Sequence, residues 1–335
     1  MTMSFYPRVE LHCHLDGALP SSTFYKLALK EGVIDKTVDE ITWKNQIIIT
    51  EAMPLSECLK RFDQITALLQ TPENLEEAAY SLALSMYEQG IRLAEIRFAP
   101  QQHISQMTQN QAVETVLRGV NKVMLIHPDM IIGIIVCMMN YGEDADNDDA
   151  NMDTLNTAIA YKDKGVVGID LAGAEGAKPT ESFRYLFEKA YHEGINITIH
   201  AGEVCPAEAV RTAMSMHAKR IGHGIHGWND PDVAKEMIAR QIPLEISVTS
   251  NILSRCVDLK HHPVREMMDQ GAVVTINTDD PLLCNVTLQS EYDLLQKEFG
   301  FTEKDLIQVN LNAARASFCQ HKEKIIKELE KAFSS

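Results

Sequence analysis

The segment from Val9 to Gly17 reads VELHCHLDG, and its two histidines, His12 and His14, stand two positions apart at the end of an apolar stretch. On a β-strand, side chains two positions apart point to the same face, so both imidazoles are expected to project together. Two converging imidazoles form half of a transition-metal site. Alone, such a pair is equally consistent with one packed and one solvated histidine.

Three further polar clusters carry compatible chemistry: IHAGE at 199–203, RIGHG at 220–224 and NTDDP at 277–281. Three histidines and one carboxylate suit zinc, and also iron, cobalt or manganese. A metal of this kind lowers the pKa of its bound water toward ~7. The four clusters together therefore predict a metal site that activates water.

Glu203 follows His200 after a small Ala-Gly turn, so it can point into the site without binding metal, which suits a general acid. His223 lies between two glycines and could orient the attacking water. Asp279 and Asp280 are adjacent and aim differently, so one can bind metal while the other meets substrate. Taken singly, each has a plainer interpretation: a solvated loop acid, a histidine bonded to a backbone carbonyl, and a cap before Pro281.

The elements that must position these residues alternate along the whole chain. Eight apolar, β-branched stretches read as strands buried on both faces. They are 9–15, 93–99, 130–139, 165–171, 195–200, 220–223, 243–249 and 272–277. Helical patterns lie between them at 72–90, 111–124, 180–191, 231–240 and 292–299. Eight alternations predict an α/β fold, a (β/α)8 TIM barrel that forms one domain over residues 1–335.

The four clusters fall at the carboxyl ends of strands one, five, six and eight, which is the rim where barrel enzymes assemble active sites. The segment from Ser21 to Glu88 is longer than one barrel helix requires, so we expect extra helices over the barrel mouth. Two other patterns are interpreted as structural. Gly142–Asp153 is expected to be a solvated acidic loop, because it lacks the glycine and terminal glutamate of a calcium loop, and His261-His262-Pro263 is expected to be a surface turn.

Composition narrows the class of protein. A net charge of −16 disfavours nucleic acid and anionic membranes as partners. Seven scattered cysteines without a CxxC pair indicate free thiols in a reducing compartment. No apolar run approaches the ~20 residues of a membrane span, and no signal-peptide pattern begins the chain. We therefore expect a cytoplasmic enzyme with a small-molecule substrate and no obligate protein partner.

The motifs together resemble the adenosine deaminase family of the amidohydrolase superfamily over nearly the whole chain. The matching stretches are HCHLDGA at 12–18, the stretch 55–62 followed by Asp63, EIRFAP at 95–100, DLAG at 170–173, HAGE at 200–203, GHG at 222–224 and NTDDP at 277–281. The resemblance implies one Zn²⁺ per chain held by His12, His14, His200 and Asp279.

The same resemblance implies roles for the remaining site residues. Glu203 would protonate purine N1, and His223 would position the attacking water. Asp280 would bond to N7, and the backbone of Gly173 would meet N3. Asp16 would bind the ribose 5′-hydroxyl. An apolar lid would be lined by Leu55, Leu59 and Phe62.

The implied substrate is a purine nucleoside, and the implied reaction is hydrolytic deamination of adenosine and 2′-deoxyadenosine in purine salvage. Ala174, Met139-Asn140 and Ser247-Val248 depart from the family pattern and concern substrate preference rather than chemistry. Alternatives are a purine deaminase for adenine, 5′-methylthioadenosine or an N6-substituted AMP, a binuclear barrel hydrolase, and a catalytically silent nucleoside-binding protein. No lysine ends strand four, which disfavours the binuclear hydrolase, and retention of Glu203 and His223 disfavours the silent protein.

Overall fold

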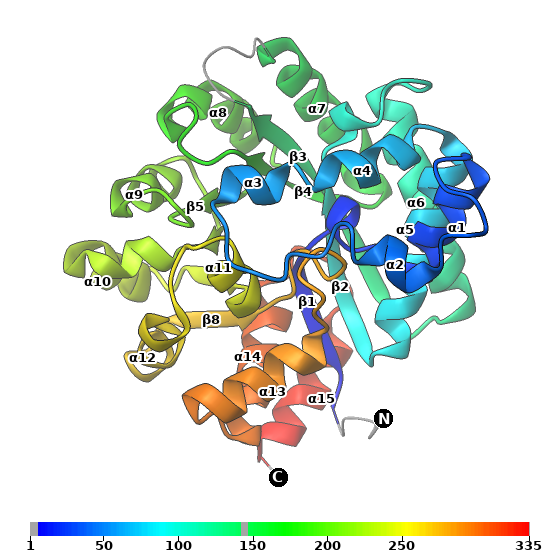
Figure 1. Cartoon of the computed structure of the whole chain (residues 1–335). Coiled ribbons are helices and arrows are strands. Elements are labelled where there is room, and N and C mark those ends of the chain that lie inside the picture. Colours follow the sequence, from blue (N-terminus) through cyan, green and yellow to red (C-terminus); the bar gives the residue numbers. More distant parts are fainter. Residues whose placement is uncertain (1–5, 142–146, 335) are drawn as a thin grey trace.

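Eight parallel strands form the centre of the molecule, with helices around them (Figure 1). The computed structural model describes residues 6–141 and 147–334. The strands are β1 (Arg8–His14), β2 (Ile91–Phe98), β3 (Ile131–Asn140), β4 (Val166–Gly173), β5 (Thr198–Ala201), β6 (Arg220–His223), β7 (Pro243–Ile246) and β8 (Val273–Ile276). The predicted (β/α)8 barrel is confirmed, and each of the eight expected strands is present.

The strands pair in chain order as two four-stranded parallel sheets, β1 to β4 and β5 to β8. A single bridge between Ile169 and Ile197 joins the sheets at one seam. At the other seam, Cys13 bridges to Asp279, whose backbone N–H donates to the carbonyl of His12 at 2.9 Å. The candidate ligand Asp279 therefore takes part in closing the ring of strands beside β1.

The helices alternate with the strands and pack their apolar faces on the barrel. They are α1 (Ser21–Lys30), α2 (Glu40–Lys44), α3 (Leu55–Leu59), α4 (Phe62–Thr66), α5 (Pro72–Glu88), α6 (Gln109–Ile126), α7 (Asp148–Tyr161), α8 (Arg184–His192), α9 (Ala207–Ser215), α10 (Pro231–Ala239), α11 (Val248–Leu253), α12 (Val264–Asp269), α13 (Leu288–Phe299), α14 (Glu303–Ala316) and α15 (Glu323–Ser334). Capping explains where α5 starts: the side chain of Thr71 accepts from the N–H of Asn74, and Pro72 takes the first helical position.

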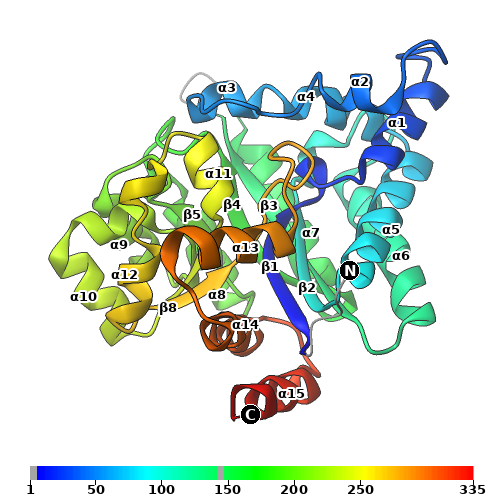
Figure 2. The same cartoon turned by 60° about the horizontal axis from the view of Figure 1, so that its bottom comes forward.

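Extra helices cover one end of the barrel, as the length of the segment 21–88 predicts. Figure 2 shows α2, α3 and α4 along that end, with α15 at the opposite end. Backbone hydrogen bonds tie this cover down: Ile49 N–H donates to Leu283 O, and Met53 N–H donates to Leu253 O, both at 2.8 Å.

Two expectations about local structure are wrong. The seventh strand ends at Ile246, because Val248 and Thr249 begin α11, where their N–H groups donate to the carboxylate of Glu291. Residues 148–153 of the expected acidic loop form the first turns of α7; residues 142–146 lie outside the described part of the chain. The helices α14 and α15 were not expected. No helix among the described residues is long and apolar enough to cross a membrane.

Candidate metal centre and active site

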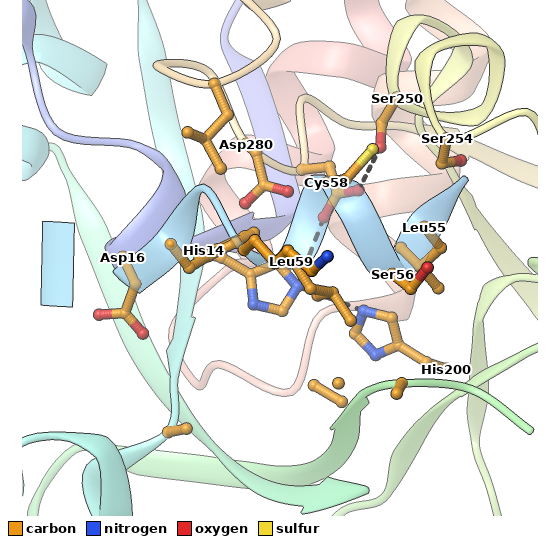
Figure 3. A pocket seen from close by; sticks show the side chains of 18 of the residues that line it. His14, Asp16, Leu55, Ser56, Cys58, Leu59, His200, Ser250, Ser254 and Asp280 are labelled. Carbon is orange, nitrogen blue, oxygen red and sulfur yellow. Dashed lines mark hydrogen bonds and ion pairs between the residues drawn. The ribbon is translucent and has the colours of Figure 1, made fainter. Parts of the chain in front are cut away.

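Four side chains from three strand ends converge at the barrel mouth. One ligand atom each from His12, His14, His200 and Asp279 lies within 4.8 Å of the other three. The Nε2 atoms of His14 and His200 are 3.2 Å apart, and Asp279 Oδ1 lies 3.2 Å from His12 Nε2 and 3.4 Å from His14 Nε2. Figure 3 shows the imidazoles of His14 and His200 in the middle of the pocket.

The outer nitrogens of two of these histidines are bound by buried carboxylates. His12 Nδ1 lies 2.9 Å from Glu245 Oε2, and His200 Nδ1 lies 2.9 Å from Asp170 Oδ2. His12 Nδ1 is hydrogen-bonded to Glu245, and His200 Nδ1 is in ion-pair contact with Asp170. A proton on Nδ1 facing the carboxylate leaves the Nε2 lone pair of each ring free to face the centre. Metal-ligating histidines typically have this arrangement.

A buried arginine joins the two carboxylates. Arg97 Nη1 donates to Asp170 and Nη2 donates to Glu245, both at 2.7 Å, and all three side chains are fully buried. Burial alone would raise the pKa of Asp170 and of Glu245, but the facing cations hold both below their usual range. Arg220 extends the network, with contacts of 2.6 Å to Glu245 and to Glu95.

The charges of this network favour a cation at the centre. The network holds four carboxylates and two guanidinium groups: Glu95, Asp170 and Glu245 pair with Arg97 and Arg220, and Asp279 faces His12. Two negative charges remain, which a divalent ion would balance. Burial and Arg97 would lower the pKa of His12, yet Asp279 and Glu245 raise it to about 9, so the centre attracts positive charge. The donor set therefore fits a transition metal.

Two residues of the site, the candidate ligand Asp279 and the neighbouring His223, have left-handed backbone conformations. His223 has φ of 61° and Asp279 has φ of 58°, a region that costs a non-glycine residue of order 1–3 kcal/mol. Gly17 of the HLDG motif is required for a different reason, because a Cβ atom there would lie 1.9 Å from Asp280 Oδ1. The surrounding fold thus enforces the directions in which His223, Asp279 and Asp280 point.

Glu203 is buried beside the ligand cluster and does not belong to it. Burial raises its pKa to about 8, with Asp279 and Glu175 adding to the effect, so the carboxyl holds its proton at neutral pH. Its Oε2 lies 3.6 Å from His223 Nε2. The loop that carries it is held by Glu175, whose carboxylate accepts from the N–H groups of Gly202, Val204 and Cys205 at 2.6–3.0 Å.

Asp280 is a second buried carboxyl whose surroundings favour the protonated form. Burial and the charge of Asp279 raise its pKa well above the usual range. Its Oδ1 has no hydrogen-bond partner among the described residues and lies in the wall of the pocket. A buried, protonated and unpaired carboxyl is suited to donate a hydrogen bond to a ligand acceptor. Gly173, at the end of β4, lines the same pocket with φ of 96°.

The pocket has a volume of about 300 Å³ and extends from the ligand cluster to the covering helices. Leu55 and Leu59 of α3 and Phe62 of α4 line it, as the resemblance implies. Met139 and Asn140, two departures from the family pattern, also line it. In Figure 3, Asp16 lies at one side of the pocket and Leu55 at the other.

Asp16 lines the pocket and has a protein partner that sequence reasoning missed. His103, fully buried, places its Nε2 2.9 Å from Asp16 Oδ1, and its Nδ1 lies 3.2 Å from Leu69 O. Asp16 is therefore oriented by a histidine from the loop after β2. The sequence PQQH at 100–103, directly after a matching motif, was the available signal.

Other residues missed from the sequence lie below the ligands. Arg97 and Glu245 are charged residues inside apolar strands, and that contrast was a usable local signal.

The expectation of a surface turn at 261–263 is wrong for one residue: His262 is 5% exposed and approaches Asn251, whose amide contacts His223. Its imidazole is needed inside because Asn251 is fully buried and requires partners for its amide.

Comparisons with known proteins show the family to which the chain is similar. A family model described as adenosine deaminase matches residues 7–332. A curated adenosine deaminase of Haemophilus ducreyi is 36% identical over 325 residues, which cover 95% of this chain and 94% of the relative. An adenine deaminase of Arthrobacter aurescens has a similar structure, with a TM-score of 0.83, 26% identity, and coverage of 98% of this chain and 100% of that one. An amidohydrolase of Burkholderia ambifaria, solved with bound zinc, superimposes with a TM-score of 0.82 at 25% identity, covering 98% and 91% of the two chains.

Proposed function

The chain belongs to the adenosine deaminase family, and from that premise we propose that it catalyses hydrolytic deamination of adenosine and 2′-deoxyadenosine to inosine and deoxyinosine, with release of ammonia. One observation carries the proposal. A carboxyl that holds its proton, Glu203, opens onto the same pocket as four converging metal-ligand atoms. Addition of water to a purine needs both an activated water and an acid for the ring nitrogen.

The metal in this proposal is one Zn²⁺, held by His12, His14, His200 and Asp279. Zinc has four-coordinate sites of this kind, and the similar amidohydrolase of Burkholderia ambifaria was solved with zinc bound. When bound, zinc lowers the pKa of water to ~7 and so supplies a nucleophile at neutral pH. Glu245 and Asp170 would keep His12 and His200 oriented toward the ion.

The chain's own residues supply the remaining steps. The water gives up one proton to become hydroxide, and Glu203 delivers its own proton to N1 as that hydroxide adds to C6. The proton of the new C6 hydroxyl then passes to the amino group, which leaves as ammonia while C6 becomes a carbonyl. His223 orients the attacking water. Asp280, protonated, donates to N7, which carries only a lone pair, and Gly173 meets N3 through its backbone. These contacts strengthen as aromaticity is lost, so the site binds the adduct more tightly than the planar ring.

The pocket favours a nucleoside over a nucleotide. Among the described residues that line it, Lys60 is the only lysine or arginine, and it is exposed and paired with Glu57 at 2.7 Å. Asp16 and Asp63 line the region beyond the ligand cluster. A phosphate there would meet carboxylates instead of the arginines that bind it well.

A second candidate is a deaminase for free adenine, 5′-methylthioadenosine or an N6-substituted AMP. The structural similarity to the adenine deaminase of Arthrobacter aurescens and the departures at Met139, Asn140 and Ala174 favour keeping it. These three residues line the pocket, so they are placed where they can affect which purine is bound.

A substrate panel separates the candidates. Ammonia release is measured for adenosine, deoxyadenosine, adenine, methylthioadenosine, N6-methyl-AMP and AMP, with Glu203→Gln as the blank. The proposal expects the highest kcat/KM for adenosine and deoxyadenosine, and a weak response to AMP. Preference for adenine, methylthioadenosine or N6-methyl-AMP would assign the second candidate. No release from any substrate by the zinc-loaded wild type would refute deamination.

We also propose a cytoplasmic setting, a single catalytic domain over residues 1–335, and no obligate protein, nucleic-acid or membrane partner. The net charge of −16 supports the last two exclusions, because phosphate-bearing surfaces attract basic proteins. The seven free cysteines support a reducing compartment. Fractionation of cells that express a tagged full chain tests the location, and a shift to the membrane pellet would contradict it.

A further inference from the structure

His262 is a buried histidine for which the proposed reaction has no role. It lies two residues before the start of α12. Its neighbour His261 is exposed and paired with Asp258 at 2.7 Å. His262 is instead 5% exposed and lies in contact range of Asn251. The two adjacent histidines therefore differ in surroundings, and only one faces the interior.

The backbone fixes the protonation of His262. Val264 N–H donates to His262 Nδ1 at 3.2 Å, so Nδ1 must carry a lone pair. Burial also lowers the pKa of His262 to about 4, which keeps the ring neutral. A neutral ring with an unprotonated Nδ1 carries its proton on Nε2. That Nε2–H is 3.4 Å from Asn251 Oδ1 and donates to it.

Asn251 links the hydrogen bond donated by His262 to the active site. Its oxygen accepts from His262, so its amide nitrogen is the atom that faces His223 Nδ1, at 2.9 Å. An amide nitrogen has hydrogens and no available lone pair, so it donates. His223 Nδ1 therefore accepts and is unprotonated. Asn251 is fully buried and His223 is 1% exposed, so water does not compete for these groups.

The consequence appears at the other end of the His223 ring. Its Nε2 lies 3.6 Å from Glu203 Oε2 and 4.0 Å from Asp279 Oδ2, on the side of the reacting atoms. With Nδ1 accepting, the proton of a neutral His223 is on Nε2. We propose that the directed chain from Val264 N–H through His262 and Asn251 fixes His223 as its Nε2–H tautomer, so that His223 donates a hydrogen bond to the attacking oxygen.

In this assignment His262 and Asn251 are positioning residues, which act through His223 and do not touch substrate. The inference deepens the proposed function and rests on it only for the identity of the attacking oxygen. A histidine with the opposite tautomer would present a lone pair to the same oxygen and would serve as a base. The tautomer thus decides which of two mechanisms His223 can serve.

The direct test is the tautomer itself. Zinc-loaded full-length protein with ¹⁵N-labelled histidine is measured by two-bond ¹H–¹⁵N correlation, and the His223 signals are assigned by their loss in His223→Gln. The proposal expects a protonated Nε2 and an unprotonated Nδ1. A protonated Nδ1 in the wild-type protein would overturn it. Because this readout needs no substrate, it stands or fails separately from deaminase activity.

Variants of the two positioning residues test whether the series of hydrogen bonds from Val264 to His223 controls the tautomer. Asn251→Asp replaces the donor by a carboxylate, which must accept, so His223 Nδ1 should become protonated and kcat should fall ~10–100-fold. His262→Phe should give mixed tautomers and a smaller loss in kcat, while His262→Gln, which keeps a donor toward Asn251, should restore most of it. KM should stay within about twofold and zinc content at one equivalent.

His261→Gln is the matched control, because it changes the adjacent exposed histidine and should leave kcat and the His223 signals unaltered. If Asn251→Asp fails to fold, His262→Phe and the wild-type spectrum still decide. Unchanged His223 signals in a folded Asn251→Asp variant, or in His262→Phe, would show that this series of hydrogen bonds does not control the tautomer.

Discussion

Substitution of Arg97, which lies beneath the metal-ligand cluster, should strongly reduce the stability of the folded protein. Its guanidinium makes ion pairs of 2.7 Å with Asp170 and with Glu245, and it donates to Leu11 O at 2.7 Å, all without solvent exposure. Arg97→Met keeps much of the volume but leaves two buried carboxylates without this cation. Breaking a buried ion pair by removing one partner costs about 3–5 kcal/mol, so we expect a free energy of unfolding lower by at least that amount.

The loss should depend on pH. In the wild-type protein the pKa values of Asp170 and Glu245 lie below their usual range, although burial opposes this, because Arg97 and other cations face them. Without Arg97 fewer cations oppose the effect of burial, so we expect both pKa values to rise above those of the unfolded chain. The folded variant then binds more protons than the unfolded chain above about pH 4, so its stability falls relative to wild type as pH rises. The deficit should be larger at pH 7.5 than at pH 5.

The assay is urea unfolding followed by circular dichroism at both pH values and at a fixed zinc concentration. Arg92→Met is the matched control on the same strand, because Arg92 makes a partly exposed pair with Asp129 at 3.0 Å, which is worth about 0–1 kcal/mol. If Arg97→Met loses no more stability than Arg92→Met, or loses it equally at both pH values, the reasoning from the buried network is wrong.

Four other outcomes can be measured directly. Metal analysis should find one zinc per chain, and Asp279→Ala should lose metal and activity together; a requirement for two equivalents would indicate a binuclear hydrolase. Glu203→Gln should retain zinc and bind substrate but turn over at least ~10²-fold more slowly, and near-normal turnover would remove Glu203 as the acid. Because the pKa of Glu203 is raised to about 8, it is protonated below that pH, so kcat should decline as pH rises above about 8 and not before. Asp16→Ala should reduce turnover of adenosine by about one to two orders of magnitude, since a hydrogen bond to a charged group is worth roughly 1.5–3 kcal/mol. It should hardly affect 5′-deoxyadenosine, and His103→Phe should reproduce this split if His103 orients Asp16.

The architecture and the rim on which the polar clusters lie could be predicted from the amino-acid sequence. Eight apolar segments separated by helical ones indicate a barrel, and parallel strands bring their carboxyl ends to one edge. His12, His200 and Asp279 could therefore be placed together from their positions at strand ends. Local signals also sufficed for caps such as Thr71 with Pro72, because a cap involves residues three or four positions apart.

Which distant charged and polar groups form contacts became clear from the folded structure. The partners of Arg97 come from β4 and β7, and the partner of His262 comes from α11, so their identities depend on strand register and barrel closure. A charged residue in an apolar strand indicates that an oppositely charged or polar partner lies close to it. Its neighbours in the sequence do not identify that partner. The seventh strand was overestimated for the same reason, since Glu291 of α13 supplies the acceptor that starts α11 at Val248. Contacts between chain segments far apart in sequence leave no local pattern, because their geometry exists only once the ring of strands has closed.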